Sequence, residues 1–569
     1  MGVLLQGFFF GPGRVRGVPS PLDGDHTTPF WWDHLATQAN AFRRAGFTAI
    51  WLPPPLKGAS GSFSSGYDVF DDYDLGSKHE KGTVSTRYGT REQLERCVAI
   101  MRANGLDVYV DLVENHRDGD DGHFHFEYVD AFGRPGKGRF SKGPMDFHPH
   151  VPRDPGVFDD TFQFGRDLAP INGAGRHAFN GLVNTGDWLT RALDIQGFRI
   201  DDVKGVSTLF LVQFLNHGAM AGKFAVGEFF DGNVGFIQSW MNAMQHRAGA
   251  FDFPLRFMLQ AMCNNPGSFD MSSLDHAGLS GADPLGSVTF VENHDTDRNS
   301  PIVRNKMLAY AYILTAEGYP CVFYRDYSTD TNCFSLKPSI DRLIWIHEHL
   351  AAGPTLQRWK DGGVFAFERL GGDHLLVALN KDPNTSRTIR VNTGFGRNTK
   401  LQDFTGHADT VTTDAASAVT LHIPSNAKGR GYVCYARPAQ PGPFPVTRRA
   451  VTQDYEGASD LDIKPALENE RVQVCRLFAD AHTRIEARLF FDSSHWTQDT
   501  TIKLDLEGPD QDHLASKKYD RGTGQGASIQ FETAKKGFHT FFVEAANTPD
   551  ENKQPSFRLR VTYTAPQAL

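Results

Sequence analysis

Eight short apolar runs alternate with stretches of helical period through roughly the first 350 residues of the chain. In the stretches at 31–46 and 90–105 the apolar residues recur at the spacing of an amphipathic helix, and Gly105 closes the second in a C-cap position. Strands this continuously apolar are typical of a parallel sheet, and eight strand–helix repeats predict a (β/α)8 barrel. The runs expected to form its strands are 4–10, 47–55, 106–116, 197–203, 223–230, 249–255, 287–295 and 319–326.

One connection in this pattern is much longer than the others. About sixty residues separate the third predicted strand from the next predicted helix, at 180–195, whereas a βα loop usually has about two to six residues. The sequence therefore predicts a barrel formed by 1–116 and 180–355, with a subdomain inserted at 117–179.

After residue 355 the apolar residues follow the period of strands, which predicts a small antiparallel β-domain at 356–438. Clustered prolines predict a stiff linker at 439–446. Further strand-like runs predict a separate β-sandwich at 447–569. Two interpretations of this sandwich stay open, a carbohydrate-binding module and a stabilising appendage packed on the barrel.

Composition excludes two classes of partner. The chain is 40% hydrophobic and 22% charged, as in ordinary soluble proteins. A net charge of −9 over 569 residues forms no basic stripe, so no nucleic-acid partner is expected. No apolar run approaches the roughly 20 residues that span a bilayer, so no membrane partner is expected.

The first ten residues are apolar but lack the basic region and the cleavage site of a signal peptide. We therefore expect a cytoplasmic protein, or a secreted one whose leader has been removed. The six cysteines are widely scattered without a CxxC pair, which argues against a zinc site or a redox motif. Most are expected to be buried thiols, and a single disulfide stays open.

Acidic residues gather where the predicted barrel strands end. In an α/β barrel the catalytic groups lie at the carboxyl ends of the strands, and a buried carboxylate is costly unless it is paired. Five acids at one end of a sheet therefore indicate an active site: Asp111, Asp201, Asp202, Glu228 and Asp295.

The stretch GFRIDDVKG at 197–205 places two of these acids side by side. Side chains alternate along a strand, so Arg199 and Asp201 share one face, while Asp202 faces the helical layer and serves a cap or loop. A neighbouring guanidinium keeps Asp201 ionised, as a nucleophile must be. Glu228 has apolar neighbours that raise the pKa of a carboxyl, which suits a general acid. Two such carboxylates about 5–5.5 Å apart define a retaining glycosidase, and the charge of a third carboxylate is able to stabilise an oxocarbenium-like transition state.

Two histidines occupy matched positions at strand ends, each beside an asparagine. His116 follows Asn115, and His294 follows Asn293. A lone histidine would be read as structural, but a matched pair at a barrel mouth is expected to donate hydrogen bonds to sugar hydroxyls.

Four motifs of the chain resemble, in order and spacing, the conserved regions of the alpha-amylase superfamily of glycoside hydrolases. They are DLVENH (111–116), GFRIDDVKG (197–205), VGEFF (226–230) and FVENHD (290–295). The stretch at 51–90 is similar especially to bacterial liquefying-type alpha-amylases, and the resemblance covers about 4–438. It implies an endo-acting, retaining α-1,4-glucan hydrolase that cleaves starch and maltooligosaccharides through a covalent glycosyl-enzyme intermediate, and acts as a monomer.

The resemblance also implies a role for individual residues. Asp201 matches the nucleophile, Glu228 the general acid/base and Asp295 the transition-state stabiliser. The residues that match sugar-binding positions are Gln6, Tyr67, His116, Arg199, Lys204 and His294.

The family's structural calcium lies between the barrel and the inserted subdomain. Asn115 and Asp167 match two of its ligands, and the backbone carbonyl of Gly205 is a third candidate. The family usually has His at the position of Gly205, so an imidazole contact to the leaving-group sugar is lost. Asp154 or Asp159 could add a carboxylate, although a solvated loop is the better interpretation of both.

Two alternatives remain at this stage. The same carboxylates serve a maltodextrin- or cyclodextrin-specific hydrolase or an α-glucan transglycosylase of the same superfamily. A non-catalytic glucan-binding barrel is disfavoured, because such a protein is expected to have lost an acid and all three are present.

Overall fold

The computed structural model describes residues 2–10, 30–120, 124–129, 133–136, 138–159, 161, 164–439, 442, 444–457, 471–491, 501–519, 526–546 and 557–569. Part of the predicted linker at 439–446 therefore lies outside the described residues, as do parts of the inserted segment and of the C-terminal region. The chain divides into two compact units. One comprises 1–15, 42–51 and 225–445, and the other comprises 16–41, 52–224 and 446–569.

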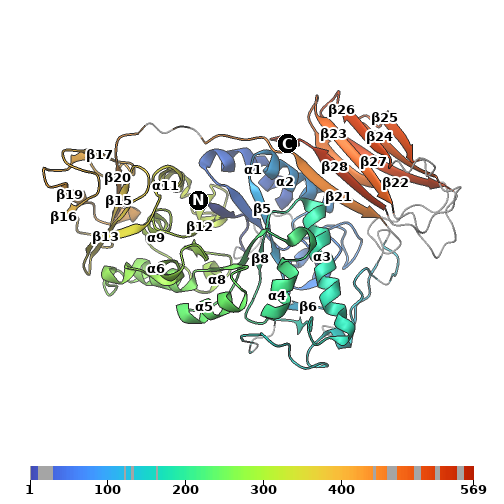
Figure 1. Cartoon of the computed structure of the whole chain (residues 1–569), viewed down its shortest axis with the longest axis horizontal. Helices are drawn as coiled ribbons and strands as arrows, with labels where there is room; N and C mark the ends of the chain where they lie inside the picture. Colours follow the sequence, from blue (N-terminus) through green and yellow to red (C-terminus); the bar gives the residue numbers. More distant parts are fainter. Residues whose placement is uncertain are drawn as a thin grey trace. The chain divides into compact units, whose positions relative to one another are not determined.

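Eight parallel strands form a closed barrel in the order β1-β12-β11-β10-β9-β8-β5-β2 (Figure 1). Each lies within one of the eight predicted runs, so the predicted (β/α)8 barrel is confirmed. The observed strands are shorter than the runs, because several runs continue past the strand into the loops that carry the acids. They are β1 (Leu4–Gln6), β2 (Ala49–Leu52), β5 (Asp107–Leu112), β8 (Gly197–Ile200), β9 (Phe224–Gly227), β10 (Gly249–Phe251), β11 (Ser287–Phe290) and β12 (Tyr319–Phe323).

The helices α2, α4, α5 and α6 each begin after a residue whose side chain caps the first turn. The helix α2 starts after Thr90, whose hydroxyl accepts a hydrogen bond from the Gln93 N–H, while the Gln93 side chain accepts one from the Thr90 N–H. It ends before Gly105, which has a φ of 83° that favours glycine. The longer helices are α1 (Trp31–Ala45), α2 (Arg91–Ala103), α3 (His177–Leu193), α4 (Thr208–Leu215), α5 (Val234–Ala243), α6 (Phe253–Asn264), α9 (Lys306–Ile313) and α11 (Lys337–Leu350).

Several short elements complete the connections. The inserted segment after β5 contains one antiparallel pair, in which β6 (His116–Arg117) pairs with β7 (Arg166–Asp167). A second pair joins β3 (Lys57–Gly58) to β4 (Val69–Asp71). The short helices are α7 (Gly278–Ala282), α8 (Thr296–Asn299), α10 (Tyr324–Tyr327), η1 (Gly61–Phe63), η2 (Pro144–Asp146), η3 (Ala174–Arg176), η4 (Gly218–Met220), η5 (Met271–Leu274) and η6 (Ala427–Gly429).

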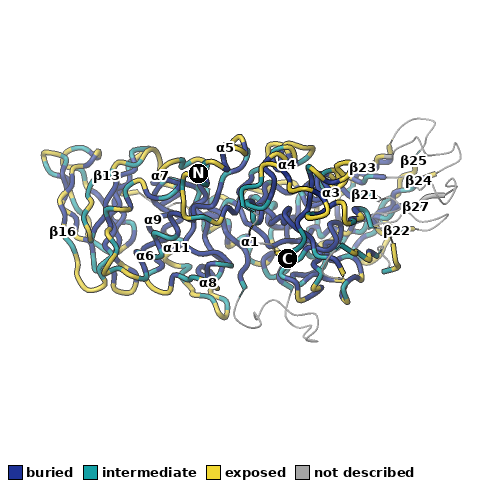
Figure 2. The backbone as a smooth tube through the Cα atoms, turned by 90° about the horizontal axis from the view of Figure 1, so that it is seen from below, coloured by how far each residue is buried: buried dark blue, intermediate teal, exposed yellow. Residues whose placement is uncertain are grey.

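An antiparallel β-domain follows the barrel, as the sequence predicts. Its six-stranded sheet runs β13 (Thr355–Lys360), β14 (Val364–Arg369), β15 (Leu375–Asn380), β20 (Tyr432–Ala436), β17 (Lys400–Asp403) and β18 (Val411–Thr412). The strands β16 (Arg387–Asn392) and β19 (Ala418–Ile423) form a separate pair. Along β16 buried and exposed residues alternate (Figure 2), and side chains from both sheets share one hydrophobic core.

The C-terminal region contains two four-stranded antiparallel sheets, and the predicted β-sandwich is confirmed. One sheet runs β21 (Val451–Gly457), β28 (Phe557–Tyr563), β23 (Arg484–Phe491) and β26 (Ser528–Glu532). The other runs β22 (Arg471–Ala479), β27 (Gly537–Ala546), β24 (Thr501–Glu507) and β25 (His513–Tyr519). The sequence interpretation missed β21 and β25, whose polar residues hide the strand pattern.

All six cysteines lie in the described residues and are free thiols, five of them buried, which resolves the open question of a disulfide. Within the described ranges, no helix combines the length and the apolar composition that a membrane crossing requires.

Candidate active site

The predicted acids follow the carboxyl ends of barrel strands. Asp201 comes directly after β8 and Glu228 directly after β9, while Asp295 follows β11 across the loop VENH. The strands are parallel, so these ends belong to the same end of the closed barrel. One group of predicted residues lies in the unit that contains 52–224, and the other lies in the unit that contains 225–445.

In the unit that contains 52–224, a single guanidinium holds two carboxylates. Arg199 Nη1 donates to Asp201 Oδ1 at 2.6 Å and to Asp111 Oδ1 at 2.8 Å. Asp111 and Arg199 are register partners on β5 and β8. Arg199 and Asp111 are buried, whereas Asp201 keeps 9% of its surface exposed. The face shared by Arg199 and Asp201 thus carries a fixed carboxylate beside a permanent positive charge.

Asp111 is the most strongly perturbed member of this group. Burial raises its pKa to about 7, although Arg199 acts to lower it, and the neighbouring Asp201 raises it further. Near neutral pH Asp111 therefore holds a proton part of the time, and the guanidinium charge then serves Asp201 alone.

Asp202 leaves the strand. Its φ of 36° is left-handed, so the alternation of faces stops after Asp201. The Asp202 carbonyl accepts a hydrogen bond from the Gly205 N–H at 3.2 Å, which closes a turn. Burial raises the pKa of Asp202 to about 7, with a further contribution from Asp201. Asp202 thus belongs to the loop.

Tyr67 is fixed at two points. Its hydroxyl donates to Asp111 Oδ2 at 2.8 Å, and its carbonyl oxygen lies 2.8 Å from His116 Nε2. His116 is buried, and its ring lies 6.1 Å from the exposed ring of Phe164. Lys204 is half-buried, and its carbonyl accepts the N–H groups of Phe158 and Asp159, both at 3.0 Å.

In the unit that contains 225–445, a glutamine amide and aromatic rings contact His294. Gln6 Nε2 lies 2.9 Å from His294 Nδ1, so that Nδ1 accepts and Nε2 carries the proton. Nε2 lies 3.3 Å from Asp295 Oδ2. The rings of Phe8 and Phe10 lie 5.0 Å and 5.1 Å from the imidazole. The Asp295 side chain is 39% exposed. The aromatic rings thus hold His294, and His294 contacts an acid that faces solvent.

Glu228 is followed by two phenylalanines, one buried and one exposed. The surface of Glu228 is 8% exposed, and Phe229 is buried. Phe230 is 48% exposed, and its ring lies 4.5 Å from that of Phe253 and 5.9 Å from that of Phe257. The sequence interpretation overlooked Phe230 as a candidate sugar platform, although it closes the VGEFF motif.

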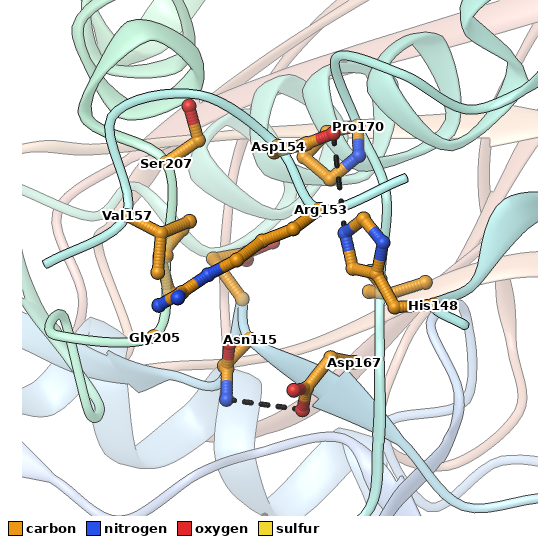
Figure 3. Close-up of a pocket in the computed structure, with 12 residues that line it drawn as sticks. Asn115, His148, Arg153, Asp154, Val157, Asp167, Pro170, Gly205 and Ser207 are labelled. Atoms are coloured by element: carbon orange, nitrogen blue, oxygen red, sulfur yellow. Dashed lines mark hydrogen bonds and ion pairs between the residues drawn. The ribbon is translucent and has the colours of Figure 1, made fainter. Parts of the chain in front are cut away.

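The three predicted metal ligands line one pocket (Figure 3). Asn115 Nδ2 donates to Asp167 Oδ1 at 3.4 Å, and Gly205 packs so closely that a Cβ there would lie 2.7 Å from Asn115 Oδ1. A histidine side chain, which the family usually has at this position, would therefore collide with Asn115. Arg153 extends across the pocket with its guanidinium toward Gly205.

Two further acids, Glu114 and Asp154, line this pocket. Burial raises the pKa of Glu114 to about 8, which leaves it mostly neutral at pH 7. Asp154 accepts the N–H groups of Ile171 and Asn172, both at 2.8 Å, as a loop anchor. Among the described residues there is no cluster of three or more His, Cys, Asp or Glu suited to a metal. Of the three predicted ligands only Asp167 offers a carboxylate, while Asn115 and Gly205 can offer an amide and a backbone carbonyl oxygen.

Comparison with known proteins places these motifs in a family, although no family model matches the chain. A glucan 1,4-alpha-maltohexaosidase from Bacillus sp. (strain 707) is 33% identical over 365 residues, which cover 54% of this chain and 68% of that protein. An alpha-amylase from Geobacillus stearothermophilus is 30% identical over 487 residues, which cover 72% of this chain and 87% of that protein.

A solved structure extends the likeness in fold to nearly the whole chain. The gamma-CGTase from Alkalophilic bacillus clarkii covers 97% of this chain and 95% of its own, with a TM-score of 0.56 at 16% identity. The two relatives in sequence carry the assignment of family, because they combine at least 30% identity with coverage of more than two thirds of their own length. The chain belongs to the alpha-amylase superfamily of glycoside hydrolases.

Proposed function

We propose that this protein is an endo-acting alpha-amylase that hydrolyses α-1,4-glucosidic bonds of starch and maltooligosaccharides with retention of configuration. The observation that carries the proposal is the pairing of Asp201 with Arg199 at 2.6 Å directly after β8. The guanidinium orients the carboxylate through a charge-assisted hydrogen bond, and the exposed fraction of Asp201 leaves it accessible to a sugar.

The proposed reaction has two steps. Glu228 donates its proton to the glycosidic oxygen while Asp201 attacks the anomeric carbon, so that the C–O bond to the leaving sugar breaks and an ester to Asp201 forms. Glu228 then takes a proton from water, which attacks the same carbon and releases Asp201. Two inversions leave the product in the α configuration.

The remaining predicted residues fit the binding of the sugar at the cleavage point. The half-buried Tyr67 offers a ring for stacking, and His116 and His294 offer imidazoles that can donate hydrogen bonds to sugar hydroxyls. The exposed carboxylate of Asp295 stabilises positive charge that develops in the transition state. Phe230 offers a further apolar face for a glucose ring.

The substitution of Asp201 by Asn tests this assignment, with Asp202→Asn as the matched control. We expect Asp201→Asn to lower kcat on soluble starch by about three orders of magnitude or more, because the nucleophile is lost. Asp202→Asn should stay within about tenfold of the wild type, since that side chain belongs to the loop. Near-wild-type turnover in Asp201→Asn would overturn the proposal and revive the non-catalytic glucan-binding barrel.

One observation keeps a second activity under consideration. Gly205 has no side chain beside Lys204, on the proposed leaving-group side, where loss of a sugar contact changes the balance between water and a second sugar as acceptor. A transglycosylase, or a hydrolase specific for maltodextrin or cyclodextrin, uses the same three acids. Product analysis on amylose and on cyclodextrin separates these activities, since an endo-acting hydrolase yields short linear products from amylose without new linkages.

We further propose that Ca²⁺ occupies the pocket of Asn115, Asp167 and Gly205, with Arg153 displaced. Bound there, the ion would link the inserted segment to the barrel and stabilise the fold. Chelation should lower the temperature of thermal unfolding, and added Ca²⁺ should restore it. Asp167→Asn should abolish this response, whereas Asp159→Asn in the neighbouring loop should keep it. An unchanged unfolding temperature after chelation would contradict the calcium proposal. The location in the cell and the monomeric state stay predictions.

A further inference from the structure

The C-terminal sandwich shares a hydrophobic core with a helix of the barrel. Ala99 and Ala103 of α2 belong to the core that the sandwich sheets form around Val451 and Tyr455. Within this unit the edge strand β21 lies against α3 (Figure 1), and the edge strand β22 contacts α2. Both docked edges are thereby covered, which supports an integral element and not a tethered module.

Polar contacts extend this shared surface. Asn104 Nδ2 donates to the Gln567 carbonyl at 2.9 Å, and Arg449 Nη1 lies 2.8 Å from Asp107 Oδ1. Gln473 Nε2 donates to Glu92 Oε1 at 3.2 Å. These contacts join three separate parts of the C-terminal region, the last residues among them, to β5 and to the helix α2 and its C-cap.

Glu456 on β21 connects three parts of the chain. Its Oε2 lies 2.6 Å from Arg139 Nη2 of the inserted segment, and its Oε1 lies 2.6 Å from Arg191 Nη2 of α3. Although burial opposes it, the two guanidinium groups lower the pKa of Glu456. We call Glu456, Arg139 and Arg191 the Glu456 cluster.

Arg139 is held from its other side by aromatic rings. Its guanidinium lies 4.2 Å from the centre of the Tyr73 ring, which in turn lies 4.8 Å from the ring of Trp188. The next residue, Phe140, is buried against α3, where a Cβ at Gly181 would lie 2.2 Å from its ring. The glycine is needed for this close approach.

From Arg139 the inserted segment leads to the proposed sugar-binding residues. Lys142 Nζ lies 2.5 Å from Asp72 Oδ2, and Arg117 Nη2 lies 2.7 Å from Asp72 Oδ1. Arg117 follows His116 on β6, and His116 contacts the Tyr67 carbonyl at 2.8 Å. The short stretch 139–142 and the buried ion pairs of Asp72 thus lead from the Glu456 cluster to two of the residues expected to bind the sugar.

We propose that Glu456 is a positioning residue through which the C-terminal sandwich holds the inserted segment in its sugar-binding arrangement. The proposal rests on the proposed function, because it assigns His116 and Tyr67 to the substrate site. Loss of the Glu456 charge frees Arg139, so that the segment 138–142 and the residues behind it are less well placed for substrate.

The test uses the full chain with Glu456→Gln and two control variants. Glu486→Gln removes an acid on β23 that pairs with Arg488. Asp454→Asn weakens the sandwich at the same strand, where Asp454 pairs with Arg560 at 2.9 Å and with Arg558. Asp454 also lies 3.9 Å from Arg191, but this variant leaves the contact between Glu456 and Arg139 in place. Kinetics on soluble starch are measured well below the unfolding temperature of every variant.

We expect Glu456→Gln to raise KM about fivefold with kcat within about twofold, because the segment is misplaced before chemistry begins. Asp454→Asn should lower the unfolding temperature with KM unchanged, and Glu486→Gln should change neither quantity. Adding Glu456→Gln to Arg139→Gln should raise KM no further, since each substitution alone already breaks the contact between Glu456 and Arg139.

Three results would overturn the proposal. They are an unchanged KM in Glu456→Gln, an additive effect in the double variant, and a loss of retention on insoluble starch with unchanged KM on soluble starch. The last result would identify the sandwich as a binding surface. A wild-type protein that does not hydrolyse starch would instead contradict the proposed function, whatever Glu456 does.

Discussion

Two buried carboxylates in the same unit have opposite electrostatic surroundings. Asp72, at the base of the inserted segment, has two cations of its own, Arg117 at 2.7 Å and Lys142 at 2.5 Å. Asp111, in the candidate active site, shares the single guanidinium of Arg199 with a second acid. Despite burial, the two cations lower the pKa of Asp72 to about 2, whereas burial raises that of Asp111 to about 7.

The difference separates a structural ion cluster from a functional one. At Asp72 the cations outnumber the acid, so the buried charge is compensated and the segment is held in place. At Arg199 the acids outnumber the cation, which stability alone would not favour. The excess of negative charge indicates that this second cluster is arranged for a developing positive charge on a substrate.

Removing the shared cation should have the largest effect. We expect Arg199→Gln to lower kcat/KM on soluble starch by about a thousandfold, because Asp201 loses the charged hydrogen-bond donor that orients it. Steady-state kinetics on soluble starch measure the loss. Arg102→Gln, which removes a cation paired with Asp107 and Asp194 on the other side of β5, serves as control and should leave kcat/KM unchanged. A loss of less than tenfold in Arg199→Gln would mean that Asp201 does not depend on this guanidinium.

Removing a cation from the structural cluster should affect stability before activity. Lys142→Met leaves Asp72 buried with Arg117 alone, so we expect the free energy of unfolding to fall by about 2–4 kcal/mol. Denaturant titration measures this change, and kcat at a temperature where the variant is folded should stay within about threefold. A fall in kcat as large as that of Arg199→Gln, with stability unchanged, would remove the distinction between the two clusters.

The two acids should also shift stability in different pH ranges. The pKa of Asp111 is raised from 3.8 to about 7, so the folded state keeps a proton that the unfolded state releases, and its contribution to stability falls as the pH rises from about 4 to about 7. The pKa of Asp72 is lowered to about 2, so its contribution is present above about pH 4 and is lost as the pH falls toward 2.

Asp111→Asn should therefore flatten the decline in unfolding free energy between pH 4 and 7, by at most about 1.4 kcal/mol per pH unit. Asp72→Asn should flatten only the acid side, below pH 4. Urea titrations across pH 2–8 measure both slopes. An unchanged slope between pH 4 and 7 in Asp111→Asn would mean that Asp111 stays ionised in the folded protein.

The sequence predicts the barrel and the positions of the acids because both depend on local patterns. Short apolar runs mark the strands, and the parity of GFRIDD places Arg199 beside Asp201, which the 2.6 Å contact matches. The register between β5 and β8, which brings Asp111 to the same guanidinium, is set by strand pairing far apart in the chain. The sequence did not predict β21 for a related reason. The charge of Glu456 on this strand is paired with two arginines that lie more than 260 residues earlier in the chain, which no local pattern reveals.

The smallest effect is expected where the comparison depends on one hydroxyl. Tyr67 donates to Asp111 at 2.8 Å, and this hydrogen bond acts to lower the pKa of that acid. Tyr67→Phe keeps the ring for stacking but removes the donor, so the pKa of Asp111 should rise and the protonated form should extend to higher pH. We expect kcat/KM at pH 7 to change by no more than about threefold, with the alkaline side of the pH profile displaced upward. Tyr88→Phe, whose hydroxyl donates to the Ser65 carbonyl at 2.8 Å, is the matched control and should leave the profile in place. A profile of Tyr67→Phe that coincides with the wild type would show that protonation of Asp111 has no influence on Asp201, and the shared guanidinium would then act on each acid separately.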